Sequence, residues 1–248
     1  FSFDDAPEEA TDKRFALNRE PFAKERLATV RSEITKLKET YPEAVGFTMF
    51  GSMVRGRATE ASDIDGYIFV DAEIAQQRHP DDVIFEDLNG ETRLVPSMEA
   101  GYAQGLRTAL ESQHGFTPEQ SQEVRVLPIS EQLIDQELEA LTQNIQAYEE
   151  YRNAQQAYWD SGMQGEAPQA PETPLVPTNL YGLFHLEVGQ GLKPMREHLI
   201  QNLQQKGEIG QKVWEEIIRN TENMERGRDA EKANYPVSLE SAPQLYGS

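Results

Sequence analysis

The chain has 248 residues, of which 43 are acidic and 23 are basic, so its formal net charge is −20. A field of that sign repels a phosphate backbone, so we do not expect a long nucleic acid as substrate. A cationic small molecule or a basic protein would be attracted instead. The absence of cysteine excludes disulfides, thiolate metal sites and cysteine nucleophiles. Hydrophobic residues make up 38% of the chain, which is enough for a core.

The ends of the sequence predict little regular structure. Residues 1–20 are acidic and carry no repeating apolar pattern, so we expect a flexible arm, and residues 231–248 are expected to be an irregular tail. The chain has no signal-peptide pattern and no apolar run long enough to cross a membrane, which favours the cytoplasm and no membrane contact. Because it begins with Phe1 rather than Met, we expect its true start to lie upstream.

The first half of the chain mixes helical and strand patterns. Apolar residues recur every three or four positions from Phe22 to Tyr41, directly after Pro21, which predicts a helix. Two strands are predicted next, at 45–50 and 65–70.

A hairpin is predicted over residues 83–95, because Asn89-Gly90 is a favourable turn pair. Ser97 is predicted to cap a helix that ends near His114-Gly115. Residues 124–129 form a last predicted strand, in which Pro128 indicates a strand end or a sheet edge.

The second half of the chain is mainly helical. A long helix is predicted from Glu131 to about Trp159, followed by a proline-rich loop at 161–178. Two more helices are predicted, at about 180–205 and 208–226. The predicted fold class is therefore α+β, with a mixed sheet flanked by helices over 21–130 and a helical C-terminal domain over 131–230.

The chemistry is concentrated in residues 50–71. Gly51-Ser52 follows a predicted strand, and after ten residues Asp63-Ile64-Asp65 leads into the next one. Alternate residues of a strand share a face, so Asp63 and Asp65 are expected to point the same way. Two adjacent carboxylates repel each other unless a cation compensates them. With no cysteine or histidine nearby, Mg²⁺ is the expected metal.

The residues ahead of the aspartates suit a phosphate group. Gly51 lets the backbone approach a phosphate closely, and Ser52 offers a hydroxyl and an amide as donors. Arg55 lies three residues further on, where a guanidinium can clamp the β- or γ-phosphate. Metal between the carboxylates and a triphosphate would neutralise the charge that develops at the α-phosphorus.

This stretch resembles the nucleotidyltransferase superfamily that includes DNA polymerase β, whose signature is Gly-Ser, a spacer of about this length and Asp-hydrophobic-Asp. The string Gly51-Ser52-Met53-Val54-Arg55-Gly56 with Ser62-Asp63-Ile64-Asp65 is most similar to bacterial small-molecule and minimal nucleotidyltransferases. The resemblance implies a nucleoside triphosphate as substrate and a two-metal mechanism. Gly66 departs from the pattern, because the family usually has a bulky apolar residue there.

The family usually carries a third carboxylate on a later strand, which binds metal and often activates the acceptor hydroxyl. Glu123 is the candidate, since Glu123-Val124-Arg125-Val126 is similar to the Leu-Glu-Val-x-Val strand of aminoglycoside adenylyltransferases. Three acids of the predicted hairpin compete with it, namely Glu86, Asp87 and Glu91. In related two-domain enzymes the helical domain contacts the nucleotide, so Lys193 and Arg196 are candidates for binding the triphosphate, although a solvated basic turn is the alternative.

The predicted function is transfer of a nucleoside monophosphate, AMP from ATP, to a hydroxyl group of a small molecule, with catalytic and metal-binding roles for Asp63, Asp65 and Glu123. Two alternatives stay open. One is an enzyme that modifies a protein or an RNA end, as minimal nucleotidyltransferases of toxin–antitoxin systems do. The other is a nucleotide-binding module without turnover. The sequence does not indicate the acceptor, the base or the oligomeric state.

Overall fold

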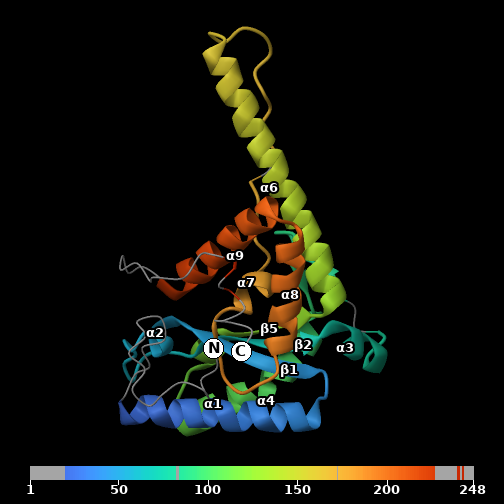
Figure 1. Ribbon diagram of the computed structural model, residues 1–248. Helices are drawn as coiled ribbons and strands as arrows, with labels where there is room; N and C mark the ends of the chain where they lie inside the picture. Colours follow the sequence, from blue (N-terminus) through green and yellow to red (C-terminus); the bar gives the residue numbers. More distant parts are fainter. Residues whose placement is uncertain (1–19, 82–83, 172, 227–238, 241, 243–248) are drawn as a thin grey trace.

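A four-stranded sheet lies between two layers of helices in the computed structural model (Figure 1). The structure describes residues 20–81, 84–171, 173–226, 239–240 and 242. The predicted arm and tail therefore lie almost entirely outside the described residues. Within those ranges no helix has the length and apolar character needed to cross a membrane.

The sheet has the strand order β5 (Val124–Ile129), β2 (Asp65–Asp71), β1 (Ala44–Phe50) and β6 (Leu186–Glu187). β2 and β5 run parallel, whereas β1 is antiparallel to both of its neighbours. β5 is an edge strand, which explains how it accommodates Pro128, a residue that has no N–H to offer to a further strand.

One face of the sheet is covered by α1 (Pro21–Thr40) and α4 (Pro96–His114). Both helices have proline in their first turn, which fits a position where the N–H needs no intrahelical partner. The prediction that Ser97 caps α4 is wrong. The N-cap is two residues earlier, at Val95, with no capping side chain, and the helix ends at His114 with Gly115 as its C-cap at φ +66°.

A short helix and a hairpin connect β2 to α4. The helix is α3 (Ala72–Arg78), and Asp71 caps it by accepting hydrogen bonds from the amides of Glu73 and Ile74. The strands β3 (Phe85–Glu86) and β4 (Thr92–Arg93) pair antiparallel, with Gly90 at φ +79° between them. The predicted hairpin and its turn are therefore confirmed.

The other face of the sheet packs against α6 (Glu131–Asp160), α7 (Thr178–Gly182), α8 (Lys193–Gln205) and α9 (Glu208–Arg226). Ser130 caps α6, whose outer half projects away from the rest of the protein (Figure 1). Trp214 of α9 is fully buried and lies edge-on to Phe184, with 4.9 Å between the ring centroids. The long helix predicted from Glu131 to about Trp159 is confirmed, since α6 spans Glu131–Asp160.

The single helix predicted over 180–205 is wrong, because β6 and a turn interrupt it. Gly189 and Gly191 adopt positive φ angles of +81° and +154°, which end any helical path between α7 and α8. The interruption lets residues 186–187 pair with β1, with Thr48 opposite Glu187. Thr48 also donates a buried hydrogen bond of 2.9 Å to the Gly182 carbonyl. The sheet of the first half is thus completed by a strand from the second half.

Gly66, which departs from the resemblance, is explained by its neighbours. A Cβ atom at this position would lie 2.3 Å from the Phe47 ring and 2.7 Å from the Thr48 carbonyl oxygen. Phe47 is fully buried between the sheet and the α1–α4 layer. The phenylalanine ring therefore occupies the space that a bulky side chain at position 66 would need.

Candidate active site

The Asp65 carboxylate lies against the backbone of Gly51. Gly51 begins α2 (Gly51–Val54), a single turn that follows β1 directly, and it has φ +78°. A Cβ atom at position 51 would lie 1.8 Å from Asp65 Oδ2. Only glycine fits here, both because of its backbone conformation and because of the carboxylate beside it.

The register of the sheet aligns Asp65 with Glu123. Gly66 pairs with Val124 between the parallel strands β2 and β5, and Asp65 and Glu123 each precede these partners by one residue. The neighbouring Tyr67 opposes Arg125 in the same register. Alternate residues share a face, so Asp65 and Glu123 point toward the same face as Tyr67, the face covered by α6–α9.

Electrostatics support this proximity. Burial raises the pKa of Asp65 to about 7, the charges of Asp63 and Glu123 act in the same direction, and Arg55 opposes them. Asp63 lies in the loop just before β2, and Ile64 between the two aspartates is fully buried. The pattern of half-buried aspartates around a buried isoleucine is the alternation expected from the sequence.

Arg55 and Ser52 lie on the turn that follows β1. Arg55 is the C-cap of α2, and its Nε donates a hydrogen bond of 3.2 Å to the Gly51 carbonyl. Ser52 lies within α2, one residue from Gly51, and its side chain is half-buried. The two predicted phosphate contacts thus come from the same short turn as Gly51, next to the Asp65 carboxylate.

The donor chemistry of this site fits a hard divalent cation. Asp63, Asp65 and Glu123 supply carboxylate oxygens, the ligands that Mg²⁺ prefers, and burial together with the charges of the other two acids raises the pKa of Asp65. The described residues contain no set of three His, Asp or Glu side chains that already surrounds one metal position. Glu123 is exposed, whereas Asp63 and Asp65 are half-buried.

Two of the three competing acids of the hairpin, Asp87 and Glu91, are engaged in ion pairs. Asp87 pairs with Arg93 at 2.8 Å. Glu91 pairs with Arg93 at 2.9 Å, lies 4.0 Å from Arg125 and accepts a hydrogen bond of 2.6 Å from Thr178. These contacts tie the hairpin to β5 and α7, so Glu123 is better placed than Asp87 or Glu91 to complete the carboxylate set.

Two residues near the site were not predicted from the sequence. Arg125 follows Glu123 by two positions on the same face of β5, which strand alternation alone could have indicated. His185 is 2% exposed, with its ring 4.8 Å from that of Phe50 and Nδ1 3.0 Å from Glu225 Oε1. No local pattern signals that contact, because it joins the segment before β6 to the end of α9.

The basic residues predicted to bind the triphosphate occupy the start of α8. Arg196 is 4% exposed and pairs with the buried Glu187 of β6 at 2.7 Å. Lys193 is half-exposed and lies 3.9 Å from Glu197. The pairing of Arg196 favours a structural role for it, and nucleotide binding by the two residues stays a prediction.

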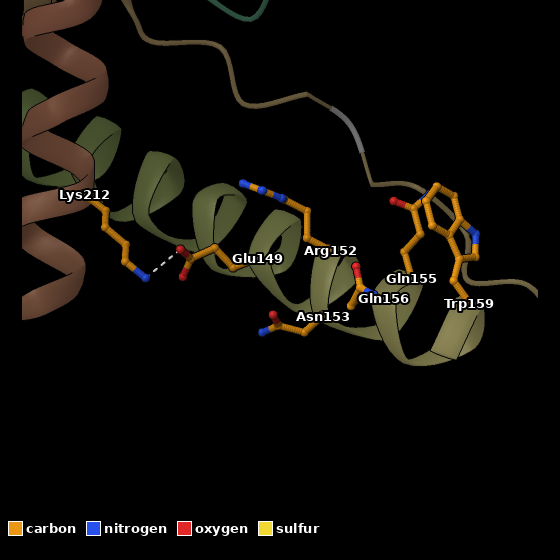
Figure 2. Close-up of a pocket in the computed structure, with 7 residues that line it drawn as sticks. All are labelled: Glu149, Arg152, Asn153, Gln155, Gln156, Trp159 and Lys212. Atoms are coloured by element: carbon orange, nitrogen blue, oxygen red, sulfur yellow. Dashed lines mark hydrogen bonds and ion pairs between the residues drawn. The ribbon is translucent and has the colours of Figure 1, made fainter. Parts of the chain in front are cut away.

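A cavity of about 480 Å³ lies along the outer half of α6 (Figure 2). Its walls come from the outer half of α6 and from Lys212 of α9, which pairs with Glu149 at 2.6 Å. None of the predicted site residues lines it. This cavity is therefore separate from the candidate site around Asp65.

The family comparison agrees with the site. Residues 30–127 match the family described as nucleotidyltransferase domain. This range starts inside α1, ends inside β5 and includes Gly51, Asp63, Asp65 and Glu123. No curated protein and no solved structure gives a significant match to the chain. Residues 30–127 are therefore similar to a nucleotidyltransferase domain, the family that the Gly51-Ser52 and Asp63-Ile64-Asp65 motif predicts.

Proposed function

We propose that the protein transfers a nucleoside monophosphate, AMP from ATP, to a hydroxyl group of a small cationic molecule. The observation that carries the proposal is the contact between Gly51 and the Asp65 carboxylate, in register with Glu123 on the adjacent strand. It brings together a backbone that can approach phosphate and carboxylates that can hold a cation.

In this proposal Asp63, Asp65 and Glu123 hold Mg²⁺, and Gly51, Ser52 and Arg55 bind the triphosphate. When bound, the metal supplies positive charge that neutralises the negative charge on the oxygens of the α-phosphate and of the leaving group. Arg55 adds a guanidinium that suits two phosphate oxygens at once. Its hydrogen bond to the Gly51 carbonyl keeps it on the side of the turn where the phosphates would lie.

The reaction needs one proton transfer and one substitution at phosphorus. The Glu123 carboxylate accepts the proton of the acceptor hydroxyl, and the hydroxyl oxygen of the acceptor forms a bond to the α-phosphorus. The bond between the α-phosphorus and the bridging oxygen breaks, and pyrophosphate leaves. Glu123 suits this role because it is exposed and aligned with Asp65 on the same face of the sheet.

The proposed acceptor class follows from charge. A net charge of −20 disfavours a polynucleotide acceptor and favours a cation. The helical layer α6–α9 covers the sheet face on which Asp65 lies, which favours an acceptor small enough to reach the carboxylates beside this layer. A compact molecule fits such a place better than a long chain.

The test is incubation of the protein with Mg²⁺ and each α-labelled triphosphate, with aminoglycosides, bulk RNA or proteins of a lysate as acceptors. We expect label on a small cationic acceptor and loss of labelling, by about 10³-fold, in Asp63→Ala and Asp65→Ala. Asp81→Ala, an exposed position beyond α3, is the matched control. Label on RNA or protein instead would overturn the acceptor class, and equal turnover in the Asp65 variant would overturn the site.

A further inference from the structure

The loop that leads into Asp63 is held by two side chains from distant parts of the chain. Arg26 of α1 donates hydrogen bonds from its guanidinium to the carbonyls of Thr59, at 3.3 Å, of Ser62, at 2.6 Å, and of Glu60. Gln120 donates from Nε2 to the remaining carbonyl, that of Ala61, at 3.1 Å. Together they bind all four successive carbonyls of residues 59–62.

Arg26 is fixed in this position by burial and by aromatic rings. Its side chain is 4% exposed, and its guanidinium carbon lies 5.0 Å from the centre of the Phe22 ring and 4.8 Å from that of Phe116. Burial lowers the pKa of Arg26, and the negative charges of Glu60 and Asp63 oppose this. Arginine stays protonated in such a setting, so its planar fork remains available to the loop.

Gln120 connects the same loop to Glu123. It lies in α5 (Pro118–Ser121), where its Oε1 accepts a hydrogen bond of 2.9 Å from the Thr117 amide in a capping box. Its other side-chain atom, Nε2, binds Ala61. Only Gln122 separates α5 from Glu123. Gln120 therefore connects the loop before Asp63 to the helix that precedes Glu123.

We propose that Arg26 and Gln120 are positioning residues that set the place of Asp63 relative to Glu123 and thereby the metal affinity of the site. The inference rests on the proposed function, in which both carboxylates hold metal. Loops without such contacts sample many backbone conformations, and fixing each residue costs about 1–2 kcal/mol of conformational entropy. Here the loop is already ordered by Arg26 and Gln120 before the metal binds, so metal binding does not have to supply that entropy loss.

Two variants distinguish a positioning role from a general contribution to the stability of the fold. Arg26→Lys keeps the positive charge but cannot present a planar fork to three carbonyls. Gln120→Glu keeps the capping box, in which Glu serves as well as Gln, but cannot donate to the Ala61 carbonyl. Arg31→Lys, on the exposed face of α1, and Gln104→Glu, on the exposed face of α4, make the same chemical changes away from the loop.

The experiment measures Mn²⁺ binding to the metal-free protein by electron paramagnetic resonance, without turnover, and amide hydrogen exchange over residues 59–65. We expect both variants to lose about 10-fold or more in Mn²⁺ affinity and to exchange faster over this segment, with both controls unchanged. Wild-type Mn²⁺ affinity in folded Arg26→Lys and Gln120→Glu proteins would overturn the inference. If Arg26→Lys does not fold, Gln120→Glu alone decides the result.

Asp63→Ala distinguishes this inference from the proposed function. If Asp63→Ala abolishes Mn²⁺ binding while the two positioning variants retain it, only the positioning role fails. If Asp63→Ala binds Mn²⁺ as the wild type does, the metal assignment of the proposed function fails, and the positioning role fails with it.

Discussion

The backbone of Gly51 and the carboxylate of Asp65 are in such close contact that a Cβ atom at position 51 would lie 1.8 Å from Asp65 Oδ2. Asp65 begins β2, and Gly51 directly follows Phe50, the last residue of β1, which pairs with Asp65. The phosphate-binding turn and the metal-binding carboxylate of the proposed site are therefore one packed unit. A substitution at Gly51 therefore has to displace the Asp65 carboxylate.

Gly51→Ala is expected to reduce turnover by about 100-fold or more, because the methyl group displaces Asp65 and the backbone is held at φ +78°. Steady-state kinetics with labelled triphosphate would measure this. Gly101→Ala is the control, since nothing lies within 4 Å of a Cβ atom there and the position is inside α4. Equal activity of the two variants would remove Gly51 from the site.

Glu123→Gln is expected to abolish turnover while sparing triphosphate binding, because the amide cannot accept the hydroxyl proton. Single-turnover kinetics and a binding titration with a non-hydrolysable triphosphate would separate the two effects. Glu86→Gln, at an exposed hairpin position that competes for the same role, should be close to wild type. The reverse result would transfer the role to the hairpin.

Glu137 should make stability depend on pH. Burial raises its pKa to about 8, against an ordinary value of 4.5, although Asn179 donates a hydrogen bond of 3.0 Å to Oε1. Between these two values the folded protein holds a proton that the unfolded chain has released. The free energy of unfolding therefore falls as pH rises from 4.5 to 8.

Glu137→Gln removes this ionisation and should flatten the dependence. We expect the variant to exceed the wild type by about 1–3 kcal/mol above pH 8 and to match it near pH 4.5. Urea unfolding at a series of pH values would measure the difference, with the exposed Glu139→Gln on the same helix as control. Parallel curves for the wild type and the Glu137 variant would contradict this expectation.

Arg196→Met should destabilise the protein more than Lys193→Met does. The substitution leaves Glu187 buried without its ion-pair partner, which costs about 3–5 kcal/mol. Lys193→Met, at a half-exposed position, should change stability by less than about 1 kcal/mol. Thermal unfolding and a nucleotide titration test both. A weaker triphosphate affinity in either folded variant would support the original prediction that these residues bind nucleotide.

Local patterns predicted much of this protein. Proline in the first turn and a regular apolar repeat were sufficient for α1, runs of strand-favouring residues for β1 and β2, and the Asn89-Gly90 turn pair for the hairpin. The spacing of Gly51-Ser52 and Asp63-Ile64-Asp65 predicted the proposed site, because residue type, spacing and strand direction are all written within 15 residues.

Only the tertiary structure decided the contacts between distant segments. The β6 strand is two residues long and is stabilised by pairing with β1. Its own sequence is too short to contain an alternating pattern that would predict it. Arg26 and Gln120 meet the loop at 59–62 from positions more than 30 and 55 residues away. The sequence by itself predicted which groups carry the proposed chemistry, since that prediction depends on residue types and short spacings. Their mutual placement depends on side-chain contacts across the fold, which local patterns do not encode.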